Sequence, residues 1–142
     1  MWYNIWWSLR FGYQMKTRLT ILRAILAAFY GVAGVAHLVA ADGFLPIVPD
    51  FVPFPRETVL LTGVCEIAGA AGLLWPRFRR WAGIGLAAYA VAVFPANLKH
   101  AIYMIPVEGL PDSWWYHAPR LVLQPVLVWL ALYAGEVFRR PS

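Results

Sequence analysis

Four long runs of apolar residues divide the chain, and shorter stretches rich in charges or prolines separate them. The runs cover about residues 19–40, 57–75, 81–104 and 116–138. A helix needs about 20 apolar residues to cross the hydrocarbon core of a bilayer, so each run is long enough to span it once. The pattern therefore predicts an all-α integral membrane protein, built as a bundle of four transmembrane helices.

Prolines interrupt two of these runs and fill one connection. Pro95 lies in the third run and Pro125 in the fourth, and a proline inside a helix removes a backbone hydrogen bond, so we expect kinks at both. The connection 44–55 alternates four prolines with bulky apolar residues. It suits neither a helix nor a central strand, and we predict a proline-stiffened cap in the outer interface. Asp42 and Gly43 are expected to end the first helix.

Charge predicts the orientation of the bundle. Lys and Arg are enriched in cytoplasmic loops, and here they gather before the first run, in the turn 77–80 and at the C-terminus. The other two connections carry mainly acidic residues, so we predict a multi-pass protein of the bacterial inner membrane with both termini cytoplasmic. Arg23, one turn inside the first run, is expected to extend its side chain back to the cytoplasmic surface.

The segment 1–16 is rich in Trp and Tyr and also carries Arg10 and Lys16. This mixture suits the headgroup region, and we predict a short interfacial helix preceding the bundle. Its charges follow the aromatic residues and no cleavage site is evident, so it does not resemble a signal peptide. An alternative is that Met15 is the natural start; the sequence leaves this open.

Composition supports one membrane domain over residues 1–142. The chain is 61% hydrophobic and only 13% charged, which is typical of membrane proteins. The net charge of +5 is explained by the basic span ends, so no nucleic-acid partner is expected. The single cysteine, Cys65, excludes paired-cysteine chemistry within one chain and is interpreted as a small buried hydrophobic residue.

Glu66 is the main candidate for chemistry, because it lies in the middle of the second apolar run. An unpaired charge at that depth costs about 2.5–3.5 kcal/mol on insertion scales, so a partner is expected. Arg120 is the best candidate, since a guanidinium stays charged and can hold a carboxylate through two hydrogen bonds. Glycines on the same helix face as Glu66, and Gly31 and Gly34 in the first run, predict close helix packing beside it.

Other polar side chains fall at a similar depth in the outer half of the runs. Spacing of three or four residues puts Asn97 with His100, and His117 with Arg120 and Gln124, on common helix faces. We therefore predict a polar chamber under the proline cap and the aromatic stretch 114–116. Its members are His37, Glu66, Asn97, His100, Arg120 and Gln124.

Two interpretations of this set remain open: it fixes the register of the helices, or it binds a ligand. His117 and Lys99 are interpreted as interfacial, and the Trp and Tyr residues near run ends as membrane anchors. Metal binding by His37, Glu66 and His100 is a weaker alternative, because no helix carries two closely spaced histidines, and no metal is predicted.

An ordered set of segments resembles the DoxX-like family of small four-helix bacterial membrane proteins. The resemblance covers about residues 19–129 and rests on GVAGVAHLVA, FLPIVPDFVP, GVCEIAGAAGLLWPRFRRWAG, VFPANLKHA and RLVLQPVLVW. It implies the four-helix topology, with His37, Glu66, Pro95, Asn97, Arg120 and Gln124 at the family's polar positions. It also implies association with membrane redox chemistry, as in a subunit of thiosulfate:quinone oxidoreductase.

Two functions follow as expectations. In the first, the chamber binds a small amphipathic molecule such as a quinone, and the protein is a redox-accessory subunit and not an enzyme on its own. No haem or flavin motif is present, so no intrinsic cofactor is expected and a partner would supply the electrons. In the second, the protein is a structural subunit of a larger membrane complex or a homo-oligomer, surrounded by the lipid bilayer.

Overall fold

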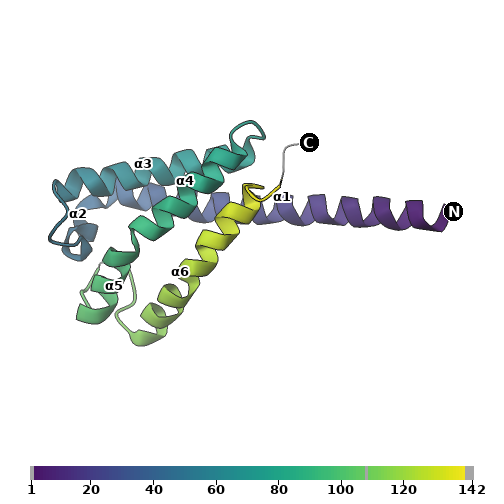
Figure 1. Ribbon diagram of the computed structural model, residues 1–142. Helices are drawn as coiled ribbons and strands as arrows, with labels where there is room; N and C mark the ends of the chain where they lie inside the picture. The colour runs from purple at the N-terminus through teal and green to yellow at the C-terminus, as the bar shows by residue number, and fades with distance from the viewer. Residues whose placement is uncertain (1, 108, 140–142) are drawn as a thin grey trace.

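The computed structural model describes residues 2–107 and 109–139, and side chains from residue 17 onward. Every regular element in these ranges is helical (Figure 1). The elements are α1 (Trp2–Val39), α2 (Ala41–Phe44), the 3₁₀ turn η1 (Leu45–Ile47), α3 (Pro55–Leu74), α4 (Arg79–Ala92), α5 (Phe94–Tyr103) and α6 (Trp114–Ala134).

Three helical stretches of the described chain are long and apolar enough to cross a membrane: Thr17–Val39, Pro55–Leu74 and Arg79–Tyr103. They match the first three predicted runs. The fourth run also forms a helix, α6, of 21 residues, but it is not among the three candidates. Polar residues in its first half lower its hydropathy, so its role as a fourth span stays a prediction.

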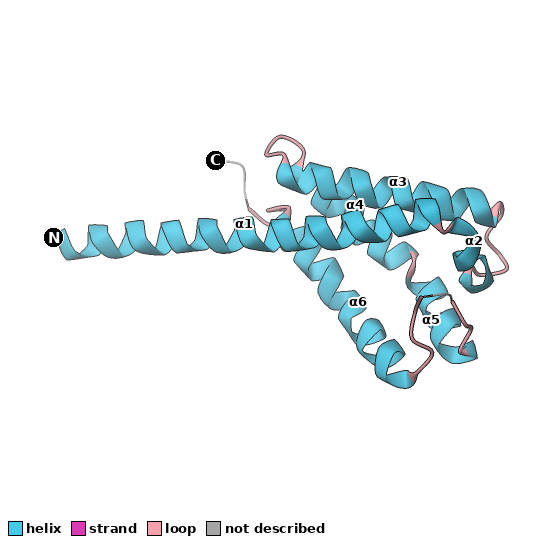
Figure 2. Cartoon of the chain, turned by 180° about the vertical axis from the view of Figure 1, so that it is seen from behind, coloured by secondary structure: helices cyan, strands magenta, loops and turns pink. Residues whose placement is uncertain are grey.

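The N-terminal segment is not a separate helix. α1 runs without a break from Trp2 to Val39, and its first part extends well beyond the other helices (Figures 1 and 2). No proline interrupts the stretch 14–20, which is instead rich in residues with good helix propensity. The expectation of a short interfacial helix preceding the first span is therefore wrong in that respect. The side chains of residues 2–16 lie outside those described.

The core forms where α1 packs on α3, α3 on α4, and α4 on α6. Leu26, Tyr30, Leu73, Leu86 and Ala131 lie at its centre. α4 therefore stands between α3 and α6. α6 lies near α1 only toward its C-terminal end and diverges from it toward the end where it begins (Figures 1 and 2).

Glycines allow two close helix approaches. A Cβ on Gly34 of α1 would lie 2.7 Å from the carbonyl oxygen of Gly63 in α3. A Cβ on Gly83 of α4 would lie 2.6 Å from the carbonyl oxygen of Ala131 in α6. Close packing at Gly34 and Gly63 confirms the prediction for the helix face that carries Glu66. The prediction was wrong for Gly31, where no atom lies within 4 Å of such a Cβ.

Pro95 interrupts the third run as predicted, because α4 ends at Ala92 and α5 begins at Phe94. Pro95 then occupies the first turn of α5, where its missing N–H breaks no intrahelical bond. Pro119 and Pro125 both lie inside a continuous α6.

The connection between α1 and α3 differs from its prediction. α1 ends at Val39, and Asp42 and Gly43 lie inside α2 rather than ending α1. Part of the proline-rich stretch forms η1, with Pro46 in its first turn. A proline fits at that position because the first turn of a helix needs no donor there.

At the opposite end of the bundle, Arg23 joins α1 to the end of α6. Its Nε donates to the carbonyl oxygen of Ala134 at 2.9 Å, and its Nη2 forms an ion pair with Glu136 at 2.6 Å. Arg79 and Arg139 also pair with Glu136. The expectation that Arg23 extends to the surface is wrong, because its side chain is only 8% exposed. We call this end, with Arg77, Arg79, Arg80 and Arg139, the basic end.

A candidate ligand site between α5 and α6

Arg120 of α6 is held by two neutral groups from α5. Its Nη1 donates to Nδ1 of His100 at 2.8 Å, and its Nη2 donates to Oδ1 of Asn97. A guanidinium can only donate, so His100 Nδ1 must be the unprotonated nitrogen of that ring. The ring of Tyr116 lies 5.5 Å from the guanidinium carbon, within range of a cation–π contact.

The hydrogen bonds continue from Asn97 to the backbone of α4. Asn97 Nδ2 donates to Gln124 Oε1 at 2.8 Å, and Gln124 Nε2 donates to the carbonyl oxygen of Ala90 at 2.5 Å. Ala90 lies in the last turn of α4, where carbonyl groups lack partners within the helix. Gln124 thus satisfies a carbonyl beside the break at Pro95, and the chain of bonds fixes both amide orientations.

His117 lies deeper in the structure than the sequence interpretation placed it. It was expected at the interface, but its ring is buried, with 1% of the residue exposed. It packs against the ring of His100, 4.6 Å away between centroids, and against Tyr116 at 5.2 Å. Neither ring nitrogen of His117 has a hydrogen-bond partner among the described residues. A buried polar group without a partner is uncommon and costs free energy.

We use the name α5–α6 cluster for Asn97, His100, His117, Arg120 and Gln124. Three of these residues are buried, and Asn97 and Arg120 are partly exposed. The spacing along α6 indicated a common face for its three members, and that part of the prediction is confirmed. The depth of His117 followed from the packing of α5 against α6 and had no signal in the sequence.

Glu66 pairs with His37 rather than with Arg120. His37 Nδ1 lies 2.6 Å from Glu66 Oε2, while Glu66 itself is 3% exposed. The phenols of Tyr30 and Tyr89 interact electrostatically with the same carboxylate. The expected ion pair of Glu66 with Arg120 is therefore wrong. α4 packs against both α3 and α6, the helices that carry them, and Tyr89 of α4 interacts electrostatically with Glu66.

The six predicted chamber residues thus fall into two groups. His37 and Glu66 lie between α1 and α3, and Asn97, His100, Arg120 and Gln124 lie between α5 and α6. The first group is covered by the ring of Phe44, 4.5 Å from that of His37. Among the described residues, no cluster of three or more His, Cys, Asp or Glu side chains could hold a metal ion.

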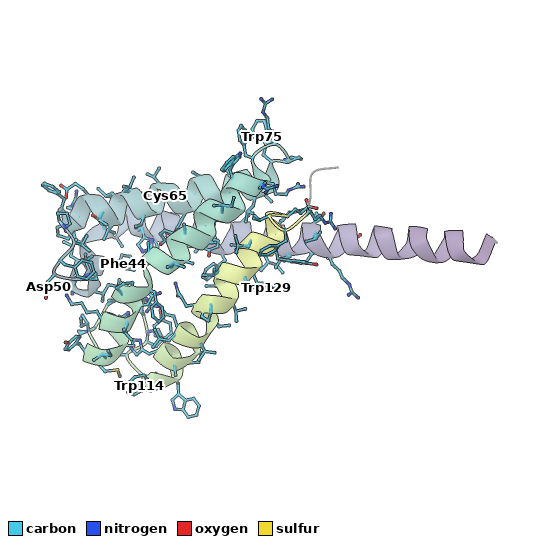
Figure 3. All side chains as sticks on the ribbon, in the orientation of Figure 1. Phe44, Asp50, Cys65, Trp75, Trp114 and Trp129 are labelled. Carbon is cyan, nitrogen blue, oxygen red and sulfur yellow. The ribbon has the colours of Figure 1, made fainter. Side chains whose placement is uncertain are left out.

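The expected cap is present in part. Lys99 of α5 donates to the carbonyl oxygen of Val48 at 2.7 Å and to Asp50 at 2.8 Å, which fastens the proline-rich connection to α5. Trp114 lies at the first turn of α6, beside His117 (Figure 3). Trp115 is 92% exposed and does not cover the cluster. Cys65, expected to be buried, is exposed on α3 (Figure 3).

A model of the family described as "Domain of unknown function (DUF8561)" matches residues 26–134. The chain belongs to this family. The DUF8561 match includes both polar groups, from His37 to Gln124, and stops short of Arg23 and Glu136 at the basic end. No curated protein and no solved structure matches the chain.

Proposed function

We propose that this DUF8561 protein spans the bacterial inner membrane four times and binds a small amphipathic molecule in the α5–α6 cluster. The arginines of the basic end would face the cytoplasm, together with both termini. Asp42, Asp50 and Asp112 would then lie at the outer end, together with the cluster. The apolar part of the ligand would remain in the lipid beside α6.

The observation that carries this proposal is the unused hydrogen-bonding capacity of His117. A neutral imidazole offers one donor and one acceptor, and both are buried here without a partner. In a purely structural cluster, such a residue would be better replaced by an apolar one. A ligand that carries polar atoms, or an ordered water that a ligand displaces, gives these nitrogens a function.

A quinone is the first candidate ligand. Its carbonyl oxygens can accept hydrogen bonds from Arg120 and His117, and its tail matches the apolar surroundings. In that case the protein would be an accessory to a membrane oxidoreductase, and the partner would supply the redox cofactor. The resemblance to DoxX-like proteins favours this function by analogy of fold alone.

Native mass spectrometry of the protein, gently extracted from its own membrane, tests the proposal. We expect a retained small molecule that disappears in Arg120→Gln and is retained less in His117→Leu. Arg56→Gln is the matched control, because Arg56 forms an exposed ion pair with Asp42 away from the cluster. A protein that retains no small molecule, or retains the same molecule in Arg120→Gln, would contradict ligand binding in this cluster.

A second function is supported by the shape of α1. Its first part extends beyond the other helices, which suits a contact with another subunit (Figure 2). The protein would then be an assembly subunit of a larger membrane complex. A variant that starts at Met15 tests this, because it should lose partner subunits in native mass spectra while the bundle stays folded. Unchanged assembly masses would contradict this function.

A further inference from the structure

Arg120 differs from the buried Arg23 by the charge of its partners. Arg23 pairs with Glu136, whereas the hydrogen-bond partners of Arg120 are an amide oxygen and an imidazole nitrogen. Among the described residues, no carboxylate lies within ion-pair distance of Arg120, although Lys99, Arg56, Arg79 and Arg139 all have one. The described chain therefore gives Arg120 no ion pair, and Asp112 acts only at longer range, through its electrostatic interaction with His100.

The neighbours of Arg120 cannot remove this charge. Arginine remains protonated in proteins. His100 accepts a hydrogen bond from Arg120 through Nδ1, so its ring is neutral while that bond exists. Because an imidazole is either neutral or positively charged, it cannot supply the negative charge that Arg120 lacks. Glu66 already pairs with His37. A charge without a counter-ion is costly inside a membrane protein, and such residues normally find an opposite charge.

We propose that the ligand of the α5–α6 cluster has an acidic head, a carboxylate or a phosphate, which supplies the missing negative charge. This inference rests on the proposed function and specifies its ligand class. A guanidinium has five N–H donors, and His100 and Asn97 accept from only two of its nitrogens. The remaining donors suit an oxyanion, and His117 can donate to the same head.

The surroundings of Arg120 suit an amphipathic acid. Val122 and Leu123, on the following turn of α6, are 70% and 51% exposed, so an apolar tail would meet apolar side chains. A quinone would satisfy the hydrogen-bond donors equally well but would leave the charge of Arg120 uncompensated. Hydrogen bonding alone therefore allows both ligand classes, and charge favours the acid.

The test compares ligands that differ only in the head. The full chain, in nanodiscs of zwitterionic lipid, is titrated with dodecanoate, dodecyl phosphate, dodecanol and decylubiquinone, and binding is measured by native mass spectrometry. We expect one acid per chain, with about tenfold or greater preference over dodecanol, since a hydrogen bond to a charged group contributes that much. The two acids distinguish a fatty-acid head from a phospholipid head.

Variants test whether the preference for the acid over dodecanol arises in the α5–α6 cluster. Arg120→Gln should remove the preference for the acid over dodecanol, His117→Leu should weaken acid binding, and Arg56→Gln should change neither. Arg120→Lys keeps the charge without the planar fork, so it should retain a reduced preference even if Arg120→Gln folds poorly. Glu108 lies outside the described residues, and Glu108→Gln should leave acid binding unchanged.

The outcomes separate this inference from the proposed function. Equal affinity for dodecanoate and dodecanol, or an acid preference that persists in folded Arg120→Gln, would overturn the acidic head. Tighter acid binding in Glu108→Gln would also overturn it, by showing that the chain itself compensates Arg120. Binding of decylubiquinone without any acid preference would overturn the inference and leave the proposed function standing. Absence of binding by all four probes would contradict both.

Discussion

Arg23 and Arg120 are both arginines on long apolar helices, and the structure uses them differently. Arg23 donates to the terminal carbonyl of α6 at Ala134 and forms an ion pair with Glu136, so its charge and its hydrogen bonds are satisfied within the chain. Arg120 has neutral partners, and beside it the nitrogens of His117 have none. The hydrogen bonds and the charge of Arg23 are therefore satisfied, whereas the α5–α6 cluster has unused hydrogen-bond donors and a positive charge without an ion pair among the described residues.

This difference indicates which polar residues hold the fold and which are available for a ligand. A guanidinium at the C-terminus of a helix meets both free carbonyls and the negative end of the helix dipole, so Arg23 stabilises the end of α6 where it meets α1. His117 would be replaced at little cost, or with a gain, if stability alone mattered, because its ring nitrogens have no partner among the described residues. Four substitutions test this difference through their effects on stability and ligand binding.

Arg23→Met should have the largest effect on stability. It leaves the Ala134 carbonyl without its donor and removes one of the three arginine partners of Glu136, so we expect a loss of about 3 kcal/mol in the free energy of unfolding. Denaturant unfolding in detergent, followed by circular dichroism, measures it. Adding Glu136→Gln should recover part of the loss. An effect below about 1 kcal/mol, as for an exposed pair, would contradict a structural role for Arg23.

Gly83→Ala should have the next largest effect, because the added Cβ would lie 2.6 Å from the Ala131 carbonyl oxygen and 2.8 Å from Gly135 Cα. Backbone atoms cannot move aside cheaply, so we expect a loss of about 2 kcal/mol in the same assay. Gly85→Ala is the matched control on α4, since no atom lies within 4 Å of its Cβ position. Equal stability of the two variants would show that α4 and α6 do not pack this closely.

His117→Leu should act in the opposite direction. It removes two buried nitrogens without partners, so the protein without ligand should gain about 1 kcal/mol in unfolding free energy while its ligand binding weakens. Thermal unfolding with and without the ligand compares the two effects. A loss of stability in the ligand-free protein would show that His117 has a structural partner, such as an ordered water.

Tyr30→Phe should have the smallest effect. The Tyr30 hydroxyl is also buried without a hydrogen-bond partner, but it lies in the core near Glu66 and outside the α5–α6 cluster. We expect a change between zero and about 1 kcal/mol toward higher stability, and unchanged ligand binding. Weakened binding in this variant would place the ligand at the Glu66 group instead.

Much of the helix layout could be predicted from the sequence. The first three apolar runs match the three helical stretches that are long and apolar enough to cross a membrane, and the fourth run forms the helix α6. Pro95 correctly marked the break between α4 and α5, because a missing N–H is a local property. Two of the failed local predictions have a clear physical reason. The aromatic composition of residues 1–16 suggested a separate helix, although no residue there ends α1. The prolines of the connection suggested an absence of helix, although Pro46 fits the first turn of η1.

Asn97, His100, Arg120 and Gln124 of the α5–α6 cluster were predicted to lie together, whereas the burial of His117 among them and the separation of Glu66 from Arg120 were not predicted. Spacing along one helix correctly grouped Arg120 with Gln124, because helical periodicity is fixed by the backbone. Which of these side chains meet across helices depends on the neighbours and the rotation of each helix, and here α4 lies between α3 and α6. Tyr89 of α4 therefore interacts with Glu66, and the Ala90 carbonyl accepts from Gln124.

Composition and spacing along the chain were enough to predict the apolar helices and the polar residues within them. The packed helices were needed to show that His37 pairs with Glu66, that Glu136 pairs with Arg23, and that His117 is buried without a partner among the described residues. This is because compensation of a buried charge requires an opposite charge within about 4–6 Å. Helix packing, and the divergence of α6 from α1, set those contacts.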